Sequence, residues 1–205
     1  MLQVNAVPPR TMDILKRLAS QPCLQNFRLV GGTALALQIG HRLSVDLDFF
    51  SDQKNDLIQI EDELLQLPDT RLKSKSSYAL FFDIENVKLD ILNYSYPFIA
   101  SPIKLENITL AHKDDITAMK LKTIMNRGAK RDFYDIYFLL NDYSFEHMFG
   151  LFEKKYSNIE PYAIVRSLGY FEDADLQSPP VLLKEKNLTW EKVKQTIIEE
   201  TKKLL

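Results

Sequence analysis

The chain has 205 residues and a formal net charge of −2, with 45% hydrophobic and 26% charged residues, which is ordinary for a globular protein and argues against disorder. This charge balance gives no global basic character, so any nucleic-acid-binding surface must be local. The single cysteine, Cys23, excludes an internal disulfide, and no apolar run approaches the roughly 20 residues of a membrane-spanning helix, so we expect a cytoplasmic protein without a membrane segment.

In the first half of the chain, apolar spacing and turn residues predict a mixture of helices and strands. We expect Thr11 to be the N-cap of the first helix and Thr33 to be the N-cap of the second, and we expect the second helix to end at Gly40. The predicted helices span residues 11–19, 33–39 and 57–67. The predicted strands span residues 27–30, 45–50, 78–84 and 87–93, the last two forming a hairpin around Glu85-Asn86.

After Pro97 and Pro102 the apolar spacing becomes almost entirely helical. The predicted helices span residues 113–126, 131–141, 145–155, 161–168 and 190–204, with a loop at Ser178-Pro179-Pro180. Strands in the first half and helices in the second predict an α+β fold. We therefore expect a sheet-containing core over residues 1–112 and a helical C-terminal domain over residues 113–205 that completes an active-site cleft.

The most informative segment is the predicted strand that carries Asp46 and Asp48. Side chains alternate across a strand, so both carboxylates share one face and repel each other unless a cation neutralises them. Oxygen ligands of this kind suit Mg²⁺ or Mn²⁺. A solvated edge strand is the alternative interpretation. Upstream, Gly31-Gly32 stands at a strand-to-helix junction, where backbone N–H groups can approach a phosphate, although a plain tight turn explains the pair equally well.

A third carboxylate, Asp90, lies opposite the apolar face of its own predicted strand. A neighbouring strand position would bring it to Asp46 and Asp48, and three carboxylates can hold two metal ions. The alternative is a solvent-facing aspartate in a hairpin. The predicted metal ligands are therefore Asp46, Asp48 and Asp90.

The string from Val30-Gly31-Gly32 to Asp46-Leu47-Asp48-Phe49, followed by Leu89-Asp90-Ile91, resembles the signature of the nucleotidyltransferase superfamily. The longer strings Gly-Gly-Thr-Ala-Leu-Ala-Leu and Arg-Asp-Phe-Tyr-Asp-Ile-Tyr resemble the AbiEii/AbiGii toxin family within it. The resemblance spans roughly Arg28 to Leu140. It implies the nucleotidyltransferase fold, a small mixed sheet with flanking helices followed by a helical domain, and transfer of a nucleotide from an NTP with Mg²⁺ or Mn²⁺.

Cations of the helical half form the second group of candidate site residues. Lys120 and Arg127 are seven residues apart on one predicted helix, and Arg131 follows four residues later, so all three can face the phosphates of an NTP. The spacing of four residues allows Arg131 to pair with Asp135. The full predicted nucleotide-binding set is Gly31, Gly32, Thr33, Arg42, Ser44, Lys120, Arg127, Arg131 and Asp135. The catalytic set is Asp46, Asp48, Asp90 and Lys120.

For the acceptor, the resemblance implies RNA, with tRNA favoured, and a toxin that is one half of a toxin–antitoxin or phage-resistance pair. Five cations between Lys120 and Arg131 predict a local basic patch for a phosphate backbone, although they can equally serve only the triphosphate. Two other functions stay open. One is nucleotidyl transfer to a protein or small molecule, and the other is a non-catalytic module that binds a partner such as a cognate antitoxin.

Overall fold

The computed structural model describes residues 2–204, and the predicted domain limits at residues 1 and 205 lie outside them. The strands are β1 (Arg28–Val30), β2 (Leu47–Ser51), β3 (Thr70–Lys75), β4 (Ala79–Ile84), β5 (Val87–Asn93), β6 (Ile103–Leu105) and β7 (Ile108–Leu110). The first helices are α1 (Pro9–Ala19), α2 (Gly31–Ile39) and α3 (Leu57–Leu64), with short 3-10 turns at Val4–Ala6 and Pro22–Leu24. The later helices are α4 (Lys113–Asn126), α5 (Lys130–Leu139), α6 (Phe145–Lys155), α7 (Tyr162–Leu168), α8 (Glu172–Asp175) and α9 (Trp190–Lys202).

Among the described residues the strands form one mixed sheet in the order β3-β4-β5-β2-β1-β7-β6. The central strand β2 pairs parallel with β5 and antiparallel with β1, which places Asp48 directly beside both Asp90 and Val30. Leu47, Phe49, Leu89 and Ile91 point to one face of these strands and are buried. Because side chains alternate along a strand, Asp48 and Asp90 share the opposite face.

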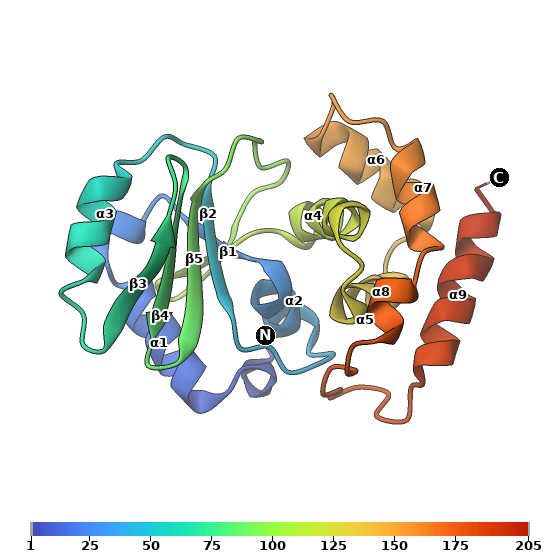
Figure 1. Cartoon of the computed structure of the whole chain (residues 1–205), viewed down its shortest axis with the longest axis horizontal. Coiled ribbons are helices and arrows are strands. Elements are labelled where there is room, and N and C mark those ends of the chain that lie inside the picture. Colours follow the sequence, from blue (N-terminus) through green and yellow to red (C-terminus); the bar gives the residue numbers. More distant parts are fainter. Residues whose placement is uncertain (1, 205) are drawn as a thin grey trace.

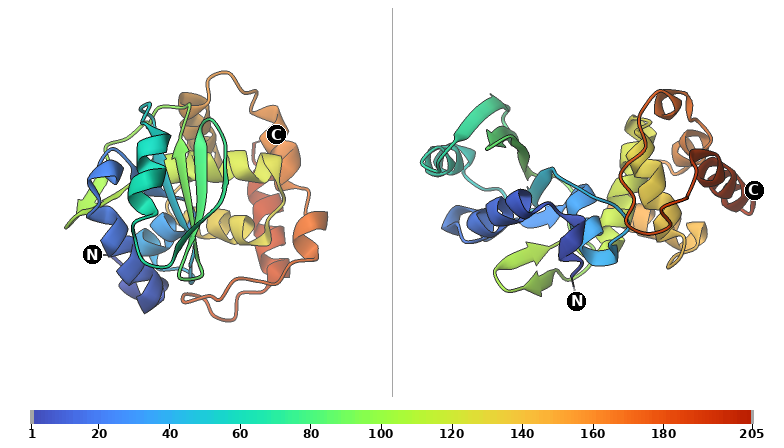
Figure 2. Two further views of the ribbon diagram at one scale, coloured as in Figure 1. Left: turned by 60° about the vertical axis from the view of Figure 1, so that its left-hand side comes forward. Right: turned by 90° about the horizontal axis from the view of Figure 1, so that it is seen from below.

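The molecule divides into a sheet half and a helical half (Figure 1). Helices α1 and α3 lie against one face of the sheet, while α4 to α9 gather on the other side, with α2 between the sheet and α4. The further views show the same separation and place the end of α4 next to α7 (Figure 2). No helix within residues 2–204 has the length and apolar character needed to cross a membrane.

A buried ion pair fastens the segment after β5 to the helical half. Asp115 at the start of α4 accepts hydrogen bonds from the backbone N–H groups of Ile99 and Ala100, at 2.9 and 3.1 Å. The Nζ atom of Lys155 donates to the same carboxylate at 2.7 Å and to the Pro97 carbonyl at 2.8 Å. Because every charge here has a partner of opposite sign or a hydrogen bond, burial of the pair is tolerated.

Several predicted elements match the structure, and others differ for identifiable reasons. The helices predicted over residues 113–126 and 145–155 and the hairpin around Glu85-Asn86 are confirmed, and Gly40 ends α2 in the left-handed conformation with φ 65°. The N-cap assignments are wrong: Pro8 precedes α1, and α2 begins at Gly31, so Thr33 lies inside the helix. Strands β3, β6 and β7 and helix α8 were not predicted, because β3 and α8 are mostly polar and β6 and β7 have only three residues each.

Candidate active site

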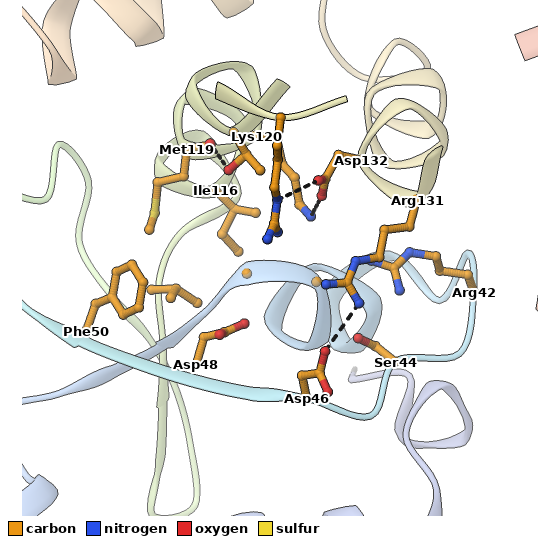
Figure 3. A pocket seen from close by; sticks show the side chains of 15 residues that line it. Arg42, Ser44, Asp46, Asp48, Phe50, Ile116, Met119, Lys120, Arg131 and Asp132 are labelled. Atoms are coloured by element: carbon orange, nitrogen blue, oxygen red, sulfur yellow. Dashed lines mark hydrogen bonds and ion pairs between the residues drawn. The ribbon is translucent and has the colours of Figure 1, made fainter. Parts of the chain in front are cut away.

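A cavity between the sheet half and the helical half brings most of the predicted site residues together (Figure 3). About 630 Å³ of space lies between its walls, part of it open solvent. Its sheet side carries carboxylates, its helical side carries cations, and one end is apolar. The lining residues are Val30, Gly31, Gly32, Arg42, Ser44, Asp46, Asp48, Phe50, Ile116, Met119, Lys120, Thr123, Arg127, Arg131 and Asp132.

Asp46 and Asp48 form the acidic side of the cavity, as their shared face predicted. Asp48 lies on β2, and Asp46 lies just before it, because the strand begins at Leu47 rather than at the predicted Val45. In Figure 3 both carboxylates point from the sheet into the cavity. Burial, then the neighbouring charge of Asp90, raises the pKa of Asp48 to about 6. A carboxylate held in this way has a strong tendency to bind a proton or a cation.

The three predicted metal ligands do not form a ready-made cluster in the structure. Within residues 2–204, no group of three Asp, Glu, His or Cys side chains is arranged to hold a metal ion. Asp46 accepts a hydrogen bond from Arg131 at 3.2 Å, and Asp90 accepts one from Lys88 at 2.7 Å. Asp90 lies beside Asp48 in register but outside the cavity lining, and its buried Oδ1 atom has no hydrogen-bond partner among the described residues.

The glycine pair at the start of α2 is required by two close approaches. Gly31 has φ 68°, and a Cβ atom there would collide with the Asp48 carboxylate. A Cβ atom on Gly32 would lie 2.5 Å from Nη2 of Arg42. The pair therefore lets the first turn of α2 reach both the acidic and the basic side of the cavity, and its amide end faces the same space.

Thr33 has a structural position rather than the cavity-facing one that was predicted. Its side chain is fully buried and absent from the cavity lining. Its hydroxyl donates to the carbonyl of Asp46 and also lies 2.9 Å from the Ser44 hydroxyl. Thr33 thus holds the backbone next to Asp46 in place, and Ser44 reaches the cavity wall from the same segment.

Asp135 is the centre of a buried polar cluster behind the basic side of the cavity. It accepts hydrogen bonds from Arg42 Nε and Nη2 at 2.6 and 2.9 Å, and Lys120 Nζ lies 2.5 Å from it. His41 Nε2 is 2.7 Å away. Burial raises the pKa of Asp135, but the charges of Arg42 and Lys120 outweigh it and hold that pKa well below its usual range.

Lys120 is held between two carboxylates, since Asp132 accepts a hydrogen bond from its Nζ atom at 2.6 Å. Burial lowers the pKa of Lys120, but Asp132 and Asp135 outweigh it and keep the amine charged. The predicted pair between Arg131 and Asp135 is wrong, because Asp135 faces the buried cluster while Arg131 reaches across the cavity to Asp46.

The expected basic patch from Lys120 to Arg131 is not a single surface. Lys120 and Lys130 are buried, and Lys122 lies over three tyrosine rings, 3.9 Å from the Tyr96 ring centre. Helix α4 ends at Asn126, so Arg127 lies just after α4 while Arg131 lies on α5. Only Arg127 and Arg131 keep largely exposed side chains, at 61% and 49%.

Comparison with known proteins agrees with this geometry. Residues 13–203 match the model of the family described as nucleotidyl transferase AbiEii toxin, Type IV TA system. The chain belongs to the AbiEii nucleotidyltransferase toxin family. It is 36% identical over 168 residues to an uncharacterized protein of Aquifex aeolicus, which covers 79% of this chain and 82% of that protein.

Two solved structures share the fold observed here. A candidate nucleotidyltransferase from H. pylori superimposes with a TM-score of 0.55 at 23% identity, covering 99% of this chain and 97% of that one. MenT4, a nucleotidyltransferase toxin from Mycobacterium tuberculosis, gives a TM-score of 0.58 at 16% identity, covering 94% and 82%. The α+β nucleotidyltransferase fold predicted from the sequence is confirmed.

Sequence reasoning missed the apolar end of this AbiEii cavity and one carboxylate on its basic side. Phe50, Ile116 and Met119 line the apolar end, and Asp132 stands beside Lys120. The position of Phe50 was predictable, because it follows Asp48 by two residues on the same face of β2. The role of Asp132 was not, since its partner Lys120 lies on a different helix.

Proposed function

We propose that the protein transfers NMP from an NTP to a hydroxyl of RNA, with tRNA as the favoured acceptor, in a reaction that depends on Mg²⁺ or Mn²⁺. The observation that supports this most is one cavity with the carboxylates of the sheet half facing cations, Lys120 and Arg131 from the helical half and Arg42 from the segment after α2. An NTP–metal complex combines both charges: its phosphates require cations, and its metal requires carboxylate oxygens.

The triphosphate would lie between the start of α2 and the cations of the helical half. The amide end at Gly31-Gly32 and the side chains of Arg42 and Lys120 surround this space. Asp135 acts from behind the cavity as a positioning residue, because it fixes the guanidinium of Arg42 and the amine of Lys120. Arg131 would leave Asp46 and turn to the phosphates when the metal complex binds.

The acidic residues supply the oxygen ligands that a divalent cation prefers, although residues 2–204 hold no group of three arranged around one position. Asp48 is a half-buried carboxylate whose pKa is raised to about 6 by burial and by Asp90, and the Oδ1 atom of Asp90 is buried without a partner among residues 2–204. Asp46, Asp48 and Asp90 would hold the ion, which when bound would neutralise charge on the carboxylates and phosphates.

In the proposed reaction the acceptor hydroxyl oxygen forms a bond to the α-phosphorus, the bond to the β-phosphate oxygen breaks, and pyrophosphate leaves. We assign Asp90 as the group that accepts the hydroxyl proton. Arg42 and Lys120 would stabilise the charge that develops on the leaving pyrophosphate. The residues thus act by positioning and by charge neutralisation.

The acceptor assignment is supported by Arg127, which lines both the active-site cavity and a neighbouring groove. A second groove, described below, shares Arg127 with the cavity and runs over exposed residues of α4 and α7. An open charged groove suits a polynucleotide better than a small acceptor, which requires enclosure. We further propose that the protein acts in the cytoplasm as a toxin of phage defence that is controlled by a cognate antitoxin.

The acceptor is tested by incubating the protein with each NTP labelled on its α-phosphate and with total RNA, purified tRNA or tRNA oxidised at its 3′ end. We expect label in intact tRNA with Mg²⁺ or Mn²⁺, and none after chelation or 3′ oxidation. Label in protein or small molecules, with none in any RNA for all four NTPs, would overturn the RNA assignment and leave nucleotidyl transfer standing.

A further inference from the structure

Two tyrosines and an arginine form an exposed row at α7. Tyr162 is 70% exposed, Arg166 follows one turn later on the same helix face, and Tyr170, 48% exposed, stands just after the helix. The buried side of α7 carries Ile164 and Leu168, which are fully inaccessible to solvent. The inner side of α7 therefore makes its contacts with the core, and the exposed tyrosine rings do not contribute to the core.

Two members of this row, Arg166 and Tyr170, line a groove that shares Arg127 with the active-site cavity. The groove is lined by the end of α4, by α7 and by the residues just after each of them, and the two helices pack against each other. Its lining includes Met125, Arg127, Arg166 and Tyr170, and Arg127 lines the active-site cavity as well. A ligand that follows the groove from α7 toward Arg127 therefore arrives at the reaction cavity.

The turn that carries Arg127 is fixed in place. Gln177 donates to the Gly128 carbonyl at 3.2 Å and accepts from the Lys130 backbone N–H at 3.0 Å. The Arg127 side chain is 61% exposed, and its carboxylate neighbour Asp132 is 3.8 Å away. Arg127 is thus a mostly solvated cation on a rigid turn at the junction of groove and cavity.

The charges of the groove favour an anion. Its lining holds two arginines and one carboxylate, Asp173. Arg166 takes part in none of the ion pairs formed within residues 2–204, so its guanidinium is available to a ligand. The Tyr170 hydroxyl donates a hydrogen bond to the Glu172 carboxylate at 3.0 Å. This bond fixes the direction of the ring and leaves the face of the ring free.

We propose that this groove, which we call the α7 groove, binds the single-stranded end of the RNA acceptor, an inference that rests on the proposed function. Bases would stack on Tyr170 and Tyr162, and backbone phosphates would contact Arg166 and Arg127. Exposed aromatic rings interleaved with arginine are the combination that single-stranded nucleic acid binds, because each base offers a face and each nucleotide a phosphate. A duplex buries its base faces and lacks the first of these interactions.

The test is the binding of a fluorescently labelled single-stranded RNA, measured by anisotropy without NTP or metal. Stacking of one base predicts that Tyr170→Ala weakens binding by about 5- to 150-fold, whereas Tyr170→Phe, which keeps the ring, binds like the natural protein. Arg166→Glu is expected to weaken binding and to reduce the salt dependence by about one phosphate contact. The affinity for NTP–Mg²⁺ should stay unchanged in all three variants.

Matched controls lie on the far edge of the sheet. Tyr78, which is 59% exposed before β4, and Arg71, which is exposed on β3, are replaced as Tyr78→Ala and Arg71→Glu, and neither should alter RNA binding. If the natural protein binds RNA and the α7 groove variants bind it equally well, the groove assignment is wrong while the RNA acceptor stands. If the natural protein binds no single-stranded RNA, both the acceptor class and the groove assignment fail.

Discussion

Replacing Asp48 by asparagine should make the metal-free protein more stable at pH 8. Burial and the adjacent Asp90 raise the pKa of Asp48 from 3.8 to about 6. A raised carboxyl pKa means that the folded state binds its proton more tightly than the unfolded state, so stability falls as pH rises from 3.8 to 6. The difference of about two units corresponds to an upper bound of about 3 kcal/mol at pH 8.

Asparagine keeps the shape of the side chain and removes this charge. We therefore expect Asp48→Asn to raise the free energy of unfolding by up to about 3 kcal/mol at pH 8, or to raise the melting temperature by roughly 6–12 °C. The gain should shrink as the pH falls below 6 and be small at pH 4, close to the unfolded-state pKa of 3.8.

The assay is urea denaturation between pH 4 and pH 8 in the presence of a chelator. Asp62→Asn, at an exposed position on α3, is the matched control and should change stability by less than about 0.5 kcal/mol at any pH. Adding Mn²⁺ should stabilise the natural protein and leave Asp48→Asn unaffected. If Asp48→Asn is no more stable than the natural protein at pH 8, the charge repulsion inferred here is absent.

Three further substitutions test other contacts. Gly32→Ala places a methyl group against the fixed guanidinium of Arg42, so it should lower the free energy of unfolding by about 1–3 kcal/mol and weaken NTP binding. Thermal melting measures the first effect and calorimetry the second. Unchanged stability and NTP binding would show that Arg42 can move aside. Asp135→Asn should cost about 3–5 kcal/mol at pH 7, and this loss should shrink only as the pH falls below the unfolded-state pKa of 3.8 toward the much lower folded-state pKa, so a loss that already disappears between pH 7 and pH 5 in urea denaturation would contradict the charge argument. Lys155→Met leaves the charge of Asp115 buried and should cost about 3 kcal/mol, and unaltered stability in the same assay would refute the pairing.

Local signals in the sequence were sufficient for the elements that depend on local physics. Helix α4 was predicted with its observed limits, because its apolar residues recur at helical spacing. The hairpin followed from Glu85-Asn86, two residues that adopt positive φ in the structure. The shared face of Asp46 and Asp48 followed from strand alternation alone.

What the sequence did not reveal depends on contacts between distant segments. Arg131 pairs with Asp46, 85 residues away, rather than with Asp135 one turn along its own helix. The sequence predicted Thr33 as an N-cap. In the structure the segment after α2 packs over Thr33, buries it and provides Ser44 and the Asp46 carbonyl as partners of its hydroxyl. Such outcomes are set by how the two halves pack, which no local spacing encodes.

The central claim is nucleotidyl transfer at the acidic side of the cavity, and a comparison of two labelled NTPs tests it most directly. The natural protein and Asp48→Asn are incubated with RNA, Mg²⁺ and an NTP labelled on either the α- or the γ-phosphate. We expect the natural protein to place α-label in the acceptor and γ-label only in released pyrophosphate, with neither product formed by Asp48→Asn. Transfer of γ-label to the acceptor, or undiminished α-label transfer by Asp48→Asn, would contradict the account.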